Sequence, residues 1–250
     1  MGSAGKRVAA RTVAEMLLSE FRDARVVGVG TGSTVALVLE ELARLDPSFF
    51  AGRVFLATSL DTLLRLKSLG ASSVSLGVQT ATPEVYFDGA DEVVLGEGCP
   101  AIKGRGAALY LEKLLAHYSS FSIMVVDESK VSKRLGELGK PVPLDADPLA
   151  LAGIENTLRR MGVRFSLREA GGKDGPVVSD TGGIVIDVDV KDVDDVVALG
   201  ARLESLPGVR ASGVFAGVFD RVVVGYDDGR SVVFDCRRGV TGAEGSAPRA

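Results

Sequence analysis

Residues 26–45 read VVGVGTGSTVALVLEELARL, and this stretch indicates the fold class. Val26 to Val29 is a short β-branched run that predicts a buried strand. The glycine-rich loop Gly30 to Thr34 follows, and apolar residues at helical spacing then continue to Leu45. A strand, a loop and a helix in succession are typical of proteins built on a parallel sheet.

The loop in the middle of this stretch has the features of an anion-binding site. Glycine lets the backbone approach a ligand closely, and loop amides at a helix N-terminus attract negative charge. The hydroxyl groups of Thr31, Ser33 and Thr34 would add donors. The alternative is an ordinary turn with Ser33 or Thr34 as the helix N-cap. The loop lacks the lysine of a Walker loop and the third glycine of a dinucleotide-binding loop.

The same pattern recurs elsewhere along the chain. A first helix is predicted for residues 6–22, and a strand over Val54 to Ala57 precedes a helix that ends near Leu69. The helix predicted for residues 106–118 precedes another buried strand, Phe121 to Val126. Strands that alternate with helices predict a Rossmann-like α/β domain, in which helices cover both faces of a parallel sheet.

The pattern changes after Pro143, where a second, smaller domain is predicted. Two helices and two strands suggest a split βαβ arrangement, as in ferredoxin-like α+β domains. These elements are helix 149–161, strand 163–167, strand 183–190 and helix 193–206. Three later runs should return to the first sheet, namely 214–219, 222–226 and 232–234. We therefore assign residues 1–141 and 212–250 to a catalytic domain and residues 142–211 to the small domain.

Composition and charge exclude some classes of partner. The 250 residues carry a net charge of −4 and a pI near 5.2, without the basic patch of a nucleic-acid-binding protein. No apolar run reaches the ~18 residues that a membrane span requires. We expect neither a nucleic-acid nor a membrane partner, and any bound phosphate must be held by local donors.

The two cysteines, Cys99 and Cys236, have neither the spacing of metal ligands nor that of a disulfide framework. We expect both to be reduced thiols in a cytoplasmic protein without a secretory signal. His117 is the only histidine and lies near the end of a predicted helix. A zinc site and a Ser-His-Asp triad are therefore not supported.

Asp88-Gly-Ala-Asp-Glu92 follows the strand-like run Val85 to Phe87. Asp88 and Asp91 can converge on one pocket at the carboxyl end of that strand. Neighbouring carboxylates push their pKa values apart, which suits proton transfer. The alternative is an Asx-type turn. A Ca²⁺ loop is not expected, because the spacing of possible ligands stops at Glu92.

Glu112 lies in the predicted helix that follows Lys103-Gly-Arg-Gly106. Its neighbours at i±3 and i±4 are all apolar: Ala108, Leu109, Leu115 and Ala116. Partial desolvation should raise the pKa of the Glu112 carboxyl and make it a general base near neutral pH. Alternatively, Glu112 lies at the margin of the apolar face and reaches water. Lys130 also follows a predicted strand, and it either meets a phosphate or is a solvated loop residue.

Four segments in chain order resemble the signature segments of type A ribose-5-phosphate isomerases. The four are Gly30-Thr-Gly-Ser-Thr34, Phe87-Asp-Gly-Ala-Asp-Glu92, Lys103-Gly-Arg-Gly-Ala-Ala-Leu109 with Glu112-Lys113, and Val126-Asp-Glu-Ser-Lys130. Further similarity lies in Leu135-Gly to Pro143, Val178-Ser-Asp-Thr-Gly-Gly183 with Ile186-Asp187, and Leu206-Pro-Gly208 with Gly213 to Ala216. The resemblance covers about residues 6–235.

The resemblance implies an aldose–ketose isomerase of the non-oxidative pentose phosphate pathway, without a metal or a cofactor. It would interconvert D-ribose 5-phosphate and D-ribulose 5-phosphate through an enediolate. Glu112 would move the proton between C1 and C2. Asp88, Asp91 and Lys103 would assist ring opening, carry the hydroxyl proton and stabilise the enediolate.

The resemblance also implies a set of contacts to the sugar phosphate. They come from three loops and one further lysine: Thr31, Gly32, Ser33 and Thr34; Gly89 and Ala90; Gly104, Arg105 and Gly106; and Lys130. Arg105 departs from the family pattern, which has glycine there, so it can add a phosphate contact or change the loop shape. Tyr110 and Leu111 also depart, from more polar residues in many relatives. A homodimer or homotetramer is expected.

Two other functions are weighed against this one. A sugar-phosphate-sensing regulator of related architecture would need a DNA-binding segment, but only about 25 residues precede the first predicted strand. An acyl-CoA transferase-like enzyme would need a glutamate that forms a covalent thioester. In that enzyme Lys103 and the pair Asp88 and Asp91 would have no obvious role.

Overall fold

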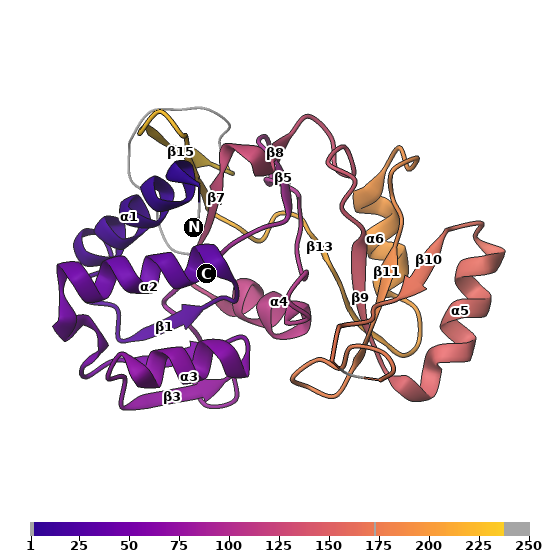
Figure 1. Ribbon diagram of the computed structural model, residues 1–250, viewed down its shortest axis with the longest axis horizontal. Coiled ribbons are helices and arrows are strands. Elements are labelled where there is room, and N and C mark those ends of the chain that lie inside the picture. The colour runs from indigo at the N-terminus through magenta and orange to yellow at the C-terminus, as the bar shows by residue number, and fades with distance from the viewer. Residues whose placement is uncertain (1–2, 173, 238–250) are drawn as a thin grey trace.

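A seven-stranded sheet forms the larger lobe of the molecule (Figure 1). The computed structural model describes residues 3–172 and 174–237. The strand order is β15-β14-β7-β4-β1-β2-β3, and all neighbouring pairs are parallel except β14 with β15. The strands are β1 (Val26–Val29), β2 (Val54–Ala57), β3 (Ser73–Leu76), β4 (Val85–Asp88), β7 (Phe121–Asp127), β14 (Arg221–Gly225) and β15 (Ser231–Asp235).

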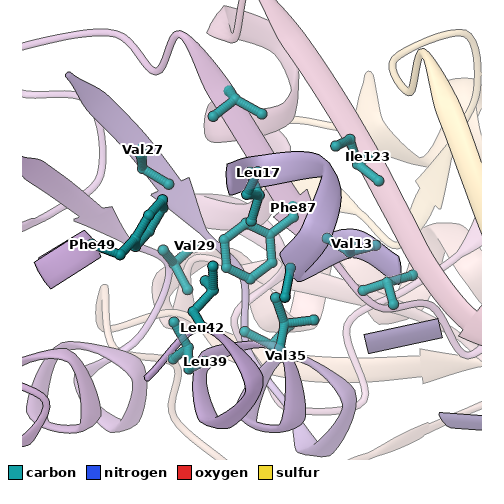
Figure 2. Packing of buried hydrophobic residues seen from close by; sticks show 14 of the residues in the cluster. Val13, Leu17, Val27, Val29, Val35, Leu39, Leu42, Phe49, Phe87 and Ile123 are labelled. Atoms are coloured by element: carbon teal, nitrogen blue, oxygen red, sulfur yellow. The ribbon is translucent and has the colours of Figure 1, made fainter. Parts of the chain in front are cut away.

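Helices cover both faces of this sheet, which confirms the predicted α/β class. One apolar cluster joins the sheet to α1 (Ala4–Ser19), α2 (Ser33–Leu45) and α3 (Leu60–Ser68), and another joins the opposite face to α4 (Leu109–Tyr118). Figure 2 shows the first cluster, in which Leu17 of α1 and Leu42 of α2 pack around Phe87 of β4. Burial on both faces explains why these strands read as continuous apolar runs.

A four-stranded antiparallel sheet forms the second lobe, with the order β10-β11-β9-β12. The chain order β-α-β-β-α-β is that of a ferredoxin-like unit, so the predicted second, smaller α+β part is confirmed. Its elements are β9 (Val142–Ala146), α5 (Leu151–Arg160), β10 (Phe165–Leu167), β11 (Ile184–Val188), α6 (Val196–Glu204) and β12 (Val209–Ser212). The division into two domains at residues 142 and 211 stays a prediction, and it includes residues 1–2, 173 and 238–250, which lie outside the described residues.

A third sheet, in the order β13-β6-β5-β8, lies between these two parts (Figure 1). Its strands have two or three residues each, too few to show an alternating pattern: β5 (Glu92–Val94), β6 (Ala101–Ile102), β8 (Val131–Ser132) and β13 (Val214–Phe215). Of the strand predicted for residues 214–219, only β13 forms, and it pairs with β6 rather than with the large sheet. That prediction was wrong. The described residues also form short 3₁₀ helices: η1 (Pro47–Phe50), η2 (Glu128–Lys130) and η3 (Pro148–Ala150).

The helix predicted to begin at residue 106 begins instead at Leu109. Gly104 has φ +101° and Ala107 has φ +60°, so both lie outside the helical region. The amide of Ala107 donates to the carbonyl of Gly104 at 3.1 Å and closes a tight turn. This turn separates Lys103 from the helix that carries Glu112.

Cys99 and Cys236 form a disulfide, so the expectation of two reduced thiols was wrong. Their Cα atoms lie 5.3 Å apart although 137 residues separate them in sequence. The loop after β5 reaches the end of β15, where the amide of Gly98 donates to the carbonyl of Cys236 at 2.8 Å. Spacing along the chain cannot reveal a contact that only folding creates. Within the described residues, no helix is long and apolar enough to cross a bilayer.

The disulfide gives a direct chemical prediction. The chain contains two cysteines in all, so the denatured but unreduced protein should show no thiol that reacts with a maleimide. Denaturation in the presence of dithiothreitol, followed by removal of the reductant, should give two reactive thiols per chain, as counted by intact-mass spectrometry. Two labelled thiols without reduction would restore the interpretation drawn from the sequence.

Candidate active site

The carboxyl ends of β1 and β4 meet at one edge of the large sheet, because the two strands are parallel neighbours. The amide of Gly30, just after β1, donates to the carbonyl of Phe87 in β4 at 2.9 Å. A Cβ atom at position 30 would lie 2.0 Å from Cγ of Asp88. Glycine is therefore required at the start of the loop for Asp88 to occupy its place.

A pocket opens at this edge and gathers nearly all the residues singled out from the sequence. Its lining is Lys6, Thr31, Gly32, Ser33, Thr34, Val35, Gly89, Ala90, Asp91, Lys103, Gly104, Arg105, Gly106, Glu112 and Lys130. Asp88 is the one predicted site residue outside this lining, since it is completely buried behind Lys103. Four loops that are distant in sequence thus contribute to one site.

Lys103 lies between two carboxylates at the bottom of the pocket. Its Nζ is 2.7 Å from Oδ2 of Asp88 and 3.2 Å from Oε2 of Glu112, and it donates to the carbonyl of Gly89 at 2.6 Å. Lys103 is 3% exposed and Glu112 2%. Glu112 therefore does not reach water at the margin of its helix, which was the alternative interpretation.

Asp88 is held by four donors. The amides of Thr31 and Gly89 donate to Oδ1 at 3.2 and 2.7 Å, while the Tyr86 hydroxyl and the Lys103 ammonium donate to Oδ2. A carboxylate with this many partners is fixed in position, and it fixes Lys103 in turn. Asp88 thus supports the lysine from behind, away from the open pocket.

Burial and the charges of neighbouring groups shift the pKa values of Glu112 and Lys103. Burial, and after it the charge of Asp88, raises the pKa of the Glu112 carboxyl to about 8, although the Lys103 ammonium opposes the rise. Burial alone would lower the pKa of Lys103, but the charges of Asp88 and Glu112 outweigh it, and that pKa lies above its usual value. The predicted rise in the Glu112 pKa is confirmed, and its cause is the one inferred from the apolar neighbours.

Asp91 lies nearer the mouth of the pocket than Asp88. Its Oδ2 accepts from the amide of Arg105 at 3.1 Å, and its side chain is 18% exposed. The Arg105 side chain is 80% exposed, with Nε 3.8 Å from Oδ1 of Asp91. Arg105 therefore extends from the mouth and makes only a loose ion pair.

The first turn of α2 faces the pocket without a side-chain cap. Gly32 is the N-cap and has φ +126°, a backbone angle that favours glycine. The interpretation of Ser33 or Thr34 as the N-cap is therefore wrong. The amides of Ser33, Thr34 and Val35 have no acceptor among the residues that the structure describes. Three free amides at a helix N-terminus can donate to a bound anion.

The Thr31 hydroxyl, which the sequence suggested as a donor to a bound anion, hydrogen-bonds to other side chains. Its Oγ1 donates to Oγ of Ser59 at 2.8 Å and lies 2.7 Å from Oγ1 of Thr58. The hydroxyl thus ties the glycine loop to the start of α3, while the Thr31 amide binds Asp88. The hydroxyls of Ser33 and Thr34 have no protein partner among the described residues, so they remain available to a ligand.

Lys6 is a pocket residue that sequence reasoning missed. It lies in the first turn of α1, and neither Lys6 nor Lys130 makes an ion pair within residues 3–172 and 174–237. The sequence contains no motif around Lys6, and the packing of α1 against α2, β14 and β7 brings it here. Two unpaired ammonium groups beside the start of α2 favour the binding of a dianion.

Across residues 3–172 and 174–237, no group of three or more His, Cys, Asp or Glu is arranged to hold a metal ion.

The sequence is similar to ribose-5-phosphate isomerase A proteins over most of its length. The model of the family described as Ribose 5-phosphate isomerase A (phosphoriboisomerase A) matches residues 54–229. Ribose-5-phosphate isomerase A of Methanothermobacter thermautotrophicus is 37% identical over 216 residues, which are 86% of this chain and 93% of that protein. The protein of the same name from Natronomonas pharaonis is 34% identical over 92% of this chain and 98% of its own.

Solved structures agree with the sequence comparison. Ribose 5-phosphate isomerase A from Methanocaldococcus jannaschii has a TM-score of 0.80 at 29% identity and covers 92% of this chain and 97% of its own. A D-ribose-5-phosphate isomerase in complex with phospho-erythronic acid has a TM-score of 0.82 at 30% identity and covers 94% and 100%. The likeness extends over both lobes. The chain belongs to the ribose 5-phosphate isomerase A family.

Proposed function

We propose that this protein interconverts D-ribose 5-phosphate and D-ribulose 5-phosphate by moving one proton between C1 and C2 of the open-chain sugar. The observation that carries the proposal is the buried cluster of Asp88, Lys103 and Glu112 beside an uncapped helix start. This single pocket offers a base, a fixed cation and an anion site, which are the three groups that an enediolate route needs.

The phosphate group binds at the start of α2. The free amides of Ser33, Thr34 and Val35 and the hydroxyls of Ser33 and Thr34 donate to its oxygens. Lys6 and Lys130 supply positive charge that the acidic chain as a whole does not. The phosphate anchors one end of the substrate and leaves C1 and C2 toward Lys103 and Glu112.

Glu112 acts as the base that moves the carbon-bound proton. Starting from the aldose, its carboxylate removes the proton from C2, and the electron pair of that bond moves to form the C1–C2 double bond of an enediolate. The negative charge then lies on O1. Protonated Glu112 returns the proton to C1, and the ketose results once the hydroxyl proton has moved from O2 to O1.

Lys103 and the two aspartates assist this transfer. The Lys103 ammonium lies 3.2 Å from Glu112 in a buried place, where it stabilises the charge on the enediolate oxygen. Asp91 is the more accessible carboxylate, which suits it to ring opening and to carrying the hydroxyl proton. Asp88 holds Lys103 in place. The exposed Arg105 aids capture of the phosphate at the pocket mouth, with the backbone of Gly89, Ala90, Gly104 and Gly106 shaping the walls.

A homodimer or homotetramer and a cytoplasmic location stay predictions for this chain. Multi-angle light scattering tests the first, and fractionation of the source cells tests the second.

Glu112→Gln keeps the shape of the side chain and removes the base. Loss of a general base costs about 10²–10⁴ in rate, so kcat should fall by at least 100-fold while the substrate still binds. A coupled assay of ribulose 5-phosphate formation measures this, with Glu15→Gln on the exposed side of α1 as the matched control. Glu112→Gln with near-native kcat would place the base elsewhere, and Asp91 would be tested next.

The raised pKa of Glu112 predicts the pH dependence of the reaction. Only the deprotonated carboxylate is a base, so activity is lost as the pH falls through the pKa of about 8. The profile of kcat/KM should show an acid limb near or above neutral pH, well above the range of an ordinary glutamate. The residual activity of Glu112→Gln should lack this limb. A flat native profile from pH 5 to 8 would contradict the assignment.

Thr34→Val tests the phosphate site, because it removes one hydroxyl donor and keeps the shape. A hydrogen bond to a charged group contributes about 1.5–3 kcal/mol, so KM for ribose 5-phosphate should rise about tenfold or more. Thr157→Val is the control, since that exposed hydroxyl bonds only groups of its own helix: it donates to the Gly153 carbonyl and accepts from the Arg160 guanidinium. Equal turnover of ribose without its phosphate by the native protein would contradict the anchoring role.

A further inference from the structure

Arg168 connects the antiparallel sheet of the second lobe to the loop that follows Lys103. It comes directly after β10, and its Nη1 donates to the carbonyls of Gly104 and Arg105, each at 2.9 Å. Its Nε donates to Oδ2 of Asp187 in β11 at 2.8 Å, and its Nη2 binds Oδ1 of the same carboxylate. The side chains of Arg168 and Asp187 are only 16% and 17% exposed.

The planar guanidinium of Arg168 is suited to binding one carboxylate and two carbonyls at the same time. Nε and Nη2 form the two-point contact with Asp187, which leaves both hydrogens of Nη1 for the two carbonyls. A lysine ammonium at this place is a point charge and cannot make the same four contacts. Asp187 thus fixes the plane of the guanidinium, and the guanidinium fixes two consecutive peptide groups.

The loop has few other anchors. Gly104 and Gly106 carry no side chain, and the side chain of Arg105 is largely in solvent. A Cβ at Gly104 would lie 2.8 Å from both Leu109 and Pro143, so the backbone is packed too closely to gain an anchor there. Hydrogen bonds to its carbonyls are therefore the main means of holding this segment between Lys103 and α4.

The carbonyl contacts also decide where the amides point. In a trans peptide the N–H lies opposite the C=O, so the amides of Arg105 and Gly106 point away from Arg168. The Arg105 amide accordingly donates to Oδ2 of Asp91 at 3.1 Å. The Gly106 amide has no acceptor within the described residues, and Gly106 lines the pocket.

We propose that Arg168, oriented by Asp187, is a positioning residue for the reaction: it turns the two loop amides toward the active site. One amide orients the Asp91 carboxylate, and the other donates to the bound substrate. The inference rests on the proposed function of the pocket. The inference gives the antiparallel sheet of the second lobe a part in positioning the active site, although its residues lie outside the pocket lining.

Two substitutions at Arg168 test this role against a matched control. Arg168→Met removes all four contacts, and Arg168→Lys keeps a positive charge near Asp187 without the double carbonyl contact. A misplacement of about 1 Å can cost 10²-fold, so both variants should lose about 10- to 100-fold in kcat/KM, with KM raised and kcat lowered. Arg164→Met is the control, because Arg164 lies just before β10 on the same sheet but binds only the surface carboxylates Asp189 and Asp192.

Separate measurement of KM and kcat distinguishes a positioning role of Arg168 from a purely structural one. A purely structural role would reduce the amount of folded enzyme and leave KM of the folded fraction unchanged, and that result would overturn the inference. Arg168→Lys with native kcat and KM would overturn it as well, because charge alone would then suffice. If Arg168→Met does not fold, Arg168→Lys alone decides. An inactive native protein would instead refute the proposed function, so the two failures are distinguishable.

Discussion

A lysine ammonium buried between two carboxylates is the interaction on which the rest of the site depends. An isolated charge is costly to bury, and the charges of Lys103 and Asp88 persist here because each has close partners. Lys103 neutralises Asp88, while Asp88 is further held by Tyr86 and two loop amides. Burial of Glu112, and after it the nearby charge of Asp88, disfavours ionisation of the Glu112 carboxyl and raises its pKa. One electrostatic arrangement therefore gives the site both a fixed cation and a base that can exchange a proton near neutral pH.

The three sheets divide the work of holding this cluster. The large parallel sheet brings the glycine loop and Asp88 to one edge, since β1 and β4 are neighbours. Lys103 directly follows β6 of the middle sheet. Glu112 lies on α4, which packs on the face of the large sheet opposite to α1, α2 and α3. The ferredoxin-like sheet then braces the loop between Lys103 and α4 through Arg168. The cluster thus depends on contacts between parts of the chain that are far apart in sequence.

The sequence alone predicted the parallel sheet and the smaller α+β unit from local patterns, and its resemblance to an isomerase family implied most of the pocket residues. Strand-like runs revealed the sheet, and the four motifs located the residues that now line one pocket. Lys6, Arg168 and the disulfide of Cys99 with Cys236 were missed for the opposite reason, as their contacts arise only when distant segments meet. The strand β9 was also missed, because Pro143 and the buried Asp145 interrupt its apolar pattern. The sequence left open whether the start of α2 offers free amides to an anion or is capped by Ser33 or Thr34, and only the structure shows Gly32 as the N-cap.

The most direct test of the central claim is a double-mutant cycle in kcat with Lys103→Met, Glu112→Gln and the double variant. If the ammonium and the carboxylate act as one unit, each single change already disables it, and the double variant should be about as slow as the slower single variant. Independent roles would instead make the two losses multiply, so that the double variant is slower by the product of both factors. That additive result in free energy would contradict the account of a single buried cluster.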